Sequence, residues 1–327
     1  MKYFFITWVA AIIAWVPAGV AAQGGSTNAA YPNRPLRFIV PYAAGGNGDI
    51  VSRIIAQKLI TQIGQQIIID NRGGAGGNIG AELAARTAPD GYTLMLGTNT
   101  HAINMSLYAK LGYDLQKDFA PITLATSAPM VLIVHPSLPA KTVKEFIALA
   151  KAYPNKLNYG TGGSGSSAHV ITELFKSMAG VQLVHVAYKG VAQSTTDLIA
   201  GQIQMTFSSP ASALAHMQAG RVRALAISSA ARSAAAPGLP TLAESGLPGF
   251  DASIWQGVFA PARTPPEIVA RLNREITGVL GASEIKEQLG AQGVDAHAST
   301  PGQFAAYIGV EIAKWAKVIK VSGAKAD

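Results

Sequence analysis

The sequence predicts an α/β protein with two lobes, each built on a mainly parallel sheet that helices cover on both faces. Apolar runs of strand length alternate along the chain with segments whose apolar residues recur at helical spacing. Two of the predicted strands end in glycine-rich turns, at residues 41–49 and 160–169. With 327 residues, the chain is long enough to form two such lobes.

The first glycine-rich turn, residues 41–49, stands between a predicted strand at 36–40 and a predicted helix that begins after Asp49. Asp49 is expected to be the N-cap of this helix, because its carboxylate can accept the first free amides. Such a turn exposes backbone N–H groups, and the helix dipole adds positive partial charge behind them. The turn therefore predicts either a small-anion site or only a tight connection that needs glycine.

The later elements divide the chain into two lobes. The first lobe is expected to add strands at 66–70 and 92–96, and the second to hold strands at 130–135, 157–159, 183–186, 203–207 and 223–228. Pro129 is expected to mark the passage into the second lobe, and a C-terminal helix at 304–321 should bury Trp315. The predicted lobes are residues 31–129 with 255–327, and residues 130–254, joined by two crossovers.

The first 22 residues have the pattern of a signal peptide. Lys2 supplies a positive start, residues 3–16 an apolar middle, and Val20-Ala21-Ala22 a small-residue cleavage site. An uncleaved membrane anchor is the alternative, since the apolar run approaches spanning length. The pattern predicts an exported, periplasmic protein.

Composition excludes several kinds of site. The chain has no cysteine, which rules out disulfides, thiolate metal sites and cysteine nucleophiles. Its formal net charge is +8, but Lys and Arg are scattered singly, which argues against nucleic acid as a partner. Histidines lack metal-ligand spacing, so no metal and no cofactor are expected. Diffuse positive charge fits the capture of anionic solutes.

The second glycine-rich turn leaves two catalytic alternatives to weigh. Gly160 to Gly165 matches the dinucleotide fingerprint G-x-G-x-x-G, but the acidic residue expected about 20 residues later is missing. A hydrolase would use Ser164, Ser166 or Ser167 with His169, yet none of these serines has both glycines of a nucleophile elbow. We expect His169 to orient the turn or pack against it.

The third interpretation is a receptor that binds a ligand without catalysing a reaction. Both glycine-rich turns lie at the carboxyl ends of predicted strands, where open α/β sheets bind ligands. Hydroxyls and backbone amides can satisfy a carboxylate without a charged partner, and each charge-assisted bond is stronger than a neutral one. The hypothesis is that one turn from each lobe grips a small carboxylate and that the ligand holds the cleft shut.

A series of ordered motifs spans the chain from Tyr31 onward. They lie at residues 31–32, 35–37, 41–49, 70–72, 74–80, 89–94, 118–121, 165–169, 188–190, 240–244 and 246–249. In these motifs the chain resembles the Bug family, the TctC-like extracytoplasmic receptors of tripartite tricarboxylate transporters. The resemblance implies a bilobed periplasmic binding protein of the type II-like class, and it implies a receptor rather than an enzyme.

The resemblance also implies which residues hold the ligand and which partner receives it. Tyr42, Ala44, Gly45, Gly46, Asn47 and Asp49 would line one side of the cleft, Gly165, Ser166 and Ser167 would face them, and Thr98 and Ser208 would lie near the rim. It implies delivery of the carboxylate to a membrane permease of one large and one small subunit. The receptor would be a monomer, and a sensing role without transport stays open.

Three positions depart from the family pattern. Gly48 stands where a hydroxyl residue is common before the aspartate, and Ala187 replaces a proline before Tyr-Lys-Gly. Ser208 stands where an acidic residue is common. Without that acid, recognition of an amino acid's ammonium group is not expected, and a plain carboxylate is the predicted ligand.

Overall fold

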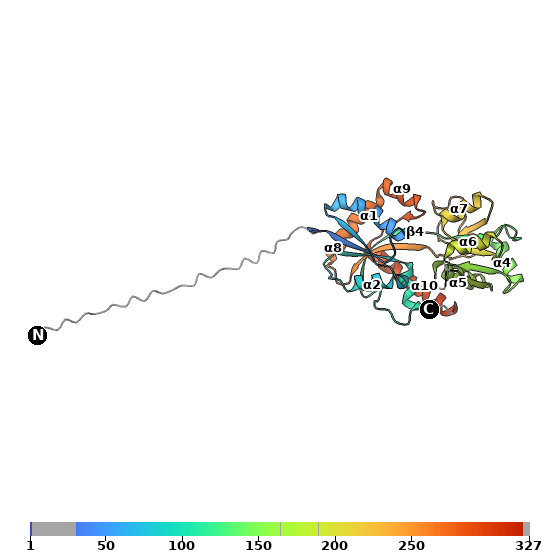
Figure 1. Cartoon of the computed structure of the whole chain (residues 1–327), viewed down its shortest axis with the longest axis horizontal. Coiled ribbons are helices and arrows are strands. Elements are labelled where there is room, and N and C mark those ends of the chain that lie inside the picture. The colour runs from blue at the N-terminus through green and yellow to red at the C-terminus, as the bar shows by residue number, and fades with distance from the viewer. Residues whose placement is uncertain (2–30, 164, 189, 323–327) are drawn as a thin grey trace. The chain divides into compact units, whose positions relative to one another are not determined.

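The computed structural model of the chain (Figure 1) describes residues 1, 31–163, 165–188 and 190–322. A compact unit begins at Pro32 and holds every helix and strand given below. Apart from Met1, the predicted signal peptide lies outside the described residues. Among the helices of the described residues, none combines the length and the apolar content that crossing a membrane requires.

The first sheet carries the first glycine-rich turn. Its strands lie in the order β11-β4-β10-β3-β1-β2, with bounds β1 Leu36–Val40, β2 Ile67–Asn71, β3 Thr93–Thr98, β4 Phe119–Ala128, β10 Ile254–Pro261 and β11 Asp295–Ala296. The associated helices are α1 Asn47–Ile63, the 3-10 turn η1 Ala75–Gly77, α2 Asn78–Ala85, α3 Asn99–Leu107, α8 Pro266–Gly281, α9 Ser283–Ala291 and α10 Pro301–Ser322.

The second sheet carries the second glycine-rich turn. Its strands lie in the order β7-β6-β8-β5-β9, with bounds β5 Val131–Val134, β6 Asn158–Thr161, β7 Val184–Ala187, β8 Met205–Ser208 and β9 Arg223–Ile227. Its helices are α4 Val143–Ala152, α5 Ser167–Ala179, α6 Val191–Ile199 and α7 Pro210–Gln218. Figure 1 shows these four helices grouped apart from α1, α2, α8 and α9.

The fold is the expected two-lobed α/β arrangement, but both sheets are mixed rather than parallel. Strands β2, β1 and β3 are parallel, whereas β10 runs antiparallel to both β3 and β4. In the second sheet, β5 runs antiparallel to β8 and β9. Strands β5 and β10 are also the first ones reached after each passage between the sheets. The lobe boundaries, predicted after residue 129 and before residue 255, stay a prediction.

Helix α10 closes the core beside β10. It packs against α3 and β4 of the first sheet and against α5 of the second. Trp315 is fully buried, as predicted, and both its indole N–H and that of Trp255 on β10 donate to Glu311 at 2.9 Å. A buried carboxylate requires such partners. Through Glu311, Trp315 is therefore linked to Trp255 and to β10, the strand that returns from the second lobe.

Candidate functional site

The first glycine-rich turn leads from β1 into α1, but the helix begins earlier than predicted. Gly46 is the N-cap, α1 starts at Asn47, and Asp49 lies in its first turn. The prediction that Asp49 is the N-cap is therefore wrong. Because Asp49 sits three residues into the helix, its carboxylate reaches back and accepts the N–H of Gly45 at 2.9 Å. Gly45 adopts a φ of +80°, which favours glycine.

Asp49 holds this turn from inside the protein. Its side chain also accepts bonds from Nε of Arg53 and Nδ2 of Asn71, both at 3.0 Å, and the residue is only 3% exposed. The hydrogen bond from Arg53 leads the causes that lower the pKa of Asp49 to about 2. Its carboxylate is thus ionised and already occupied by protein donors. Direct contact of Asp49 with a ligand stays a prediction.

The end of β3 brings a third helix start to the same edge of the sheet. Thr98 is the N-cap of α3, and its side chain accepts the N–H of Thr100 at 3.2 Å. His101 completes a capping box, since its Nδ1 accepts the N–H of Thr98 at 3.0 Å. The Tyr42 hydroxyl lies 2.5 Å from Oγ1 of Thr98 and ties this helix start to the first turn.

The second glycine-rich turn leads from β6 into α5. Ser166 is the N-cap, and its Oγ accepts the N–H of His169 at 3.4 Å. The Gly165 N–H donates to Nδ1 of His169 at 3.0 Å, which confirms that this histidine orients the turn. Its ring also stacks on His185, with centroids 4.2 Å apart. Ser164, one of the serines of the hydrolase alternative, lies outside the described residues.

The second glycine-rich turn lies close to helix α3 of the first lobe. Gly165 has a φ of +76°, and a Cβ added there would lie 2.8 Å from Cδ2 of Leu107, at the end of α3. Only a glycine lets the second turn come this close to the first lobe without moving Leu107. This contact places the second turn, just before the start of α5, against the C-terminal end of α3.

These helix starts share one cavity of about 260 Å³. The lining residues come from the first turn, from the end of β3, from α5 and from β10: Tyr42, Gly46, Asn47, Gly48, Thr98, Asn99, Thr100, Ser167, Ile254 and Gln256. Five predicted residues are among them: Tyr42, Gly46, Asn47, Thr98 and Ser167. The other predicted residues, Ala44, Gly45, Asp49, Gly165, Ser166 and Ser208, do not line this cavity.

The electrostatics of the cavity come from backbone groups rather than from ionised side chains. The first turns of α1, α3 and α5 supply N–H groups that have no intrahelical carbonyl, and each helix adds positive partial charge at this end. Among the described residues, no Lys, Arg, Asp or Glu lines the cavity. Such an arrangement can hold a small anion without placing a buried cation beside it.

Sequence reasoning missed five of the lining residues. Gly48, Asn99, Thr100, Ile254 and Gln256 were not among the predicted site residues. The polar segment after β3 was a usable signal for Asn99 and Thr100. Gln256 is the one polar side chain of the otherwise apolar strand Ile254–Pro261, and that pattern was the signal for it.

The lack of a side chain at Gly48 leaves space for the ring of Tyr42, which lines the cavity. A Cβ added at Gly48 would lie 3.2 Å from Cδ2 of Tyr42 and 3.1 Å from Cδ2 of Leu96. The absence of a side chain at Gly48 therefore lets the Tyr42 ring lie against the start of α1. Gly48 thus shapes the site through packing.

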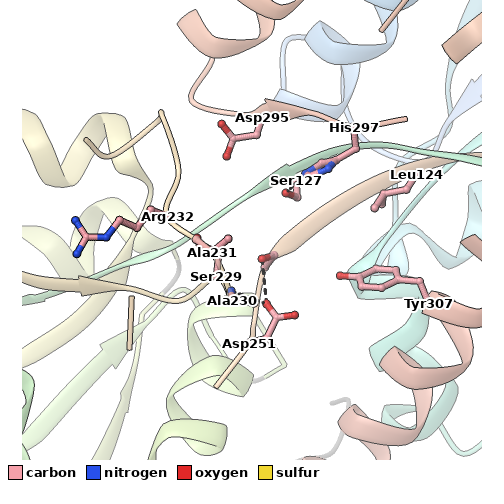
Figure 2. Close-up of a pocket in the computed structure, with 11 residues that line it drawn as sticks. Leu124, Ser127, Ser229, Ala230, Ala231, Arg232, Asp251, Asp295, His297 and Tyr307 are labelled. Atoms are coloured by element: carbon pink, nitrogen blue, oxygen red, sulfur yellow. Dashed lines mark hydrogen bonds between the residues drawn. The ribbon is translucent and has the colours of Figure 1, made fainter. Parts of the chain in front are cut away.

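Figure 2 shows a second cavity, of about 220 Å³, between the first sheet and the segment after β9. Asp251 and Asp295 both line it, and Asp251 accepts the N–H of Ala230 at 3.2 Å. Arg232, the one Lys or Arg among the described residues that line it, pairs with Glu244 at 3.1 Å. Two carboxylates disfavour an anion here, so the cavity of the three helix starts is the better candidate.

Comparisons with known proteins agree with this geometry. A sequence profile described as the tripartite tricarboxylate transporter family receptor, TctC, matches residues 51–324. Protein BugT of Bordetella pertussis is 37% identical over 310 residues, which cover 94% of each chain.

Two solved structures extend the likeness to the fold. Rpa4515 of R. palustris, solved with adipate, has a TM-score of 0.74 at 38% identity, covering 90% of this chain and 99% of its own. MatC of Rhodopseudomonas palustris, solved with malate, has a TM-score of 0.71 at 32% identity, covering 88% of this chain and 100% of its own. This chain therefore belongs to the TctC (Bug) family, the non-enzymatic periplasmic solute-binding receptors of tripartite tricarboxylate transporters.

Proposed function

We propose that this receptor captures a small carboxylate in the cleft between its lobes and delivers it to a tripartite tricarboxylate-type permease. The observation that carries the proposal is the convergence of three helix N-termini, from both sheets, on one cavity whose described lining holds no charged side chain. The free amides of these helices and the hydroxyl of Ser167 would bind the carboxylate oxygens. Each charge-assisted bond of this kind contributes about 1.5 to 3 kcal/mol.

The relatives support a carboxylate as the ligand class. Rpa4515 was solved with adipate and MatC with malate, and both structures match nearly the whole length of this fold. In the proposal, residues 1–22 are a cleaved leader that directs the protein to the periplasm. The receptor acts as a monomer, without a cofactor or nucleic acid, and its partner is a permease with one large and one small subunit.

Titration calorimetry against a panel of solutes tests the proposal. The panel comprises monocarboxylates and dicarboxylates of two to eight carbons, with glucose and ribose as uncharged solutes. We expect saturable binding of at least one carboxylate, and a change in the fluorescence of Trp255 on β10 as the cleft closes. Silence across the carboxylates, with a response to a sugar, would refute it.

Gly165→Ala is expected to weaken carboxylate binding at least tenfold. The added methyl meets Leu107 at 2.8 Å, so the second turn must move away from the first lobe. Gly180→Ala is the matched control, because Gly180 also has a positive φ, +64°, but no atom of the described residues lies within 4 Å of the added methyl. Both variants should lose about 1 to 2 kcal/mol of stability from backbone strain.

Calorimetry and urea unfolding on the two variants separate the effects. Equal affinity losses in both variants would show that backbone strain, and not the approach of the second turn to Leu107, governs binding.

A further inference from the structure

Two amide side chains in the cavity keep a buried polar atom without a partner. Gln256 is 5% exposed, and its Nε2 donates to Oδ1 of Asn47 at 2.5 Å, while its Oε1 has no partner among the described residues. Asn99 is 1% exposed, and its Nδ2 has no partner there either. Both residues line the cavity. An unpaired buried polar atom is unfavourable, so a ligand that satisfies both atoms gains affinity.

The sheet fixes the position of these two amides. Gln256 lies in register with Thr98 on β3 and with Thr126 on β4. Asn99 follows Thr98 directly and is the first residue of α3. Gln256 therefore comes from β10 and Asn99 from the residue that directly follows the adjacent strand β3, at the same edge of the first sheet and beside the helix starts that would hold the carboxylate.

The amides differ in what they offer. With its Nε2 bound to Asn47, Gln256 presents an acceptor, and Asn99 presents a donor. A hydroxyl or a carboxamide can donate to the first and accept from the second. A methyl group satisfies neither atom. A second carboxylate would face the Gln256 oxygen, and an ammonium group would find no carboxylate among the lining residues that the structure describes.

We infer that the ligand carries, besides its carboxylate, an uncharged hydroxyl or carboxamide group that Gln256 and Asn99 recognise together. The inference rests on the proposed function and narrows its ligand class. Partly buried Ile254 lines the same cavity and offers apolar surface to the methylene chain that joins the two ends of such a ligand.

Two matched series of probes test the inference by calorimetry. The four-carbon series is butyrate, γ-hydroxybutyrate, γ-aminobutyrate, succinate and succinamate. The six-carbon series is hexanoate, ε-hydroxyhexanoate, ε-aminohexanoate, adipate and adipamate. In the series that fits the cavity, the hydroxyl- or carboxamide-ended member should bind about tenfold more tightly than the members ending in methyl, ammonium or carboxylate.

Gln256→Met removes both polar atoms and keeps the length of the side chain. The affinity ratio of the hydroxyl- or carboxamide-ended probe to the methyl-ended probe should fall from about ten toward one. A purely structural role would weaken all probes equally and leave this ratio intact. Gln62→Met, at an exposed position of α1, is the matched control and should preserve the ratio.

The outcomes separate this inference from the proposed function. If carboxylates bind but the methyl- or carboxylate-ended member binds as tightly as the others, the inference is overturned and the proposed function stands. A ratio that survives Gln256→Met also overturns it. If no carboxylate in either series or in the wider panel binds, the proposed function fails and this inference falls with it.

Discussion

Asp49→Ala is expected to lower carboxylate affinity at least a hundredfold and to lower the free energy of unfolding by about 3 kcal/mol. The substitution leaves the Gly45 N–H, the Asn71 amide and the Arg53 guanidinium without their shared acceptor. The first glycine-rich turn would then lose the bonds that set its shape. Calorimetry with the tightest-binding carboxylate and urea unfolding followed by tryptophan fluorescence measure the two effects.

Asp49→Asn tests the same contacts with little change in shape. It keeps one acceptor oxygen but removes the charge, so we expect an affinity loss smaller than that of the alanine variant. Glu82→Ala is the control for loss of a carboxylate, because Glu82 belongs to a solvent-exposed pair with Arg86 and should change stability by less than about 1 kcal/mol. Wild-type affinity in both Asp49 variants would contradict the role given to this carboxylate.

The sign of the pH dependence follows from the same contacts. The pKa of Asp49 is lowered to about 2, below its ordinary value of 3.8. The stabilisation of the folded protein by ionised Asp49 is therefore complete above about pH 4 and is lost as the pH falls toward 2. The free energy of unfolding that is lost in this way is on the order of 2 kcal/mol.

The elements that the sequence predicted well are those with local signals. The strand at 36–40, the glycine-rich turn and the following helix appear in order because apolar period and glycine content are properties of short segments. The start of α1 shows the limit of such signals. Asp49 was a reasonable N-cap, but the helix begins at Asn47. The Asp49 carboxylate accepts the N–H of Gly45, before the helix, and the side-chain amide of Asn71, 22 residues away, instead of capping the helix.

The parts that the sequence could not predict depend on long-range pairing. Strand β10 enters the middle of the first sheet from the second lobe, and nothing within Ile254–Pro261 indicates its direction or its neighbours. Gln256 therefore reaches the cavity only because β10 pairs with β3, more than 150 residues earlier in the chain. The α3 capping box was missed for a different reason, since His101 takes the place that Glu or Gln usually fills.

Acid is expected to destabilise the protein strongly between pH 6.5 and pH 4, and His101 should account for much of the loss. His101 is fully buried, and burial lowers its pKa from 6.5 to about 4. In this range the unfolded chain binds a proton at His101 and the folded protein does not, so stability falls as the pH falls. The loss from this one group is on the order of 3 kcal/mol, complete near pH 4. Burial also lowers the pKa of His185 to about 4, which adds to the loss of stability over the same pH range.

His101→Gln isolates this contribution. Glutamine can accept the Thr98 N–H as His101 does, which preserves the capping box, but it does not titrate. Urea unfolding at pH 7, 6, 5 and 4 should show that the variant loses about 3 kcal/mol less than the wild type across this range. Thr98→Ala removes the other half of the box and should lower stability by the same amount at every pH, because it removes no titrating group. If the wild type and His101→Gln lose stability in parallel, the buried imidazole is not the source of the acid sensitivity.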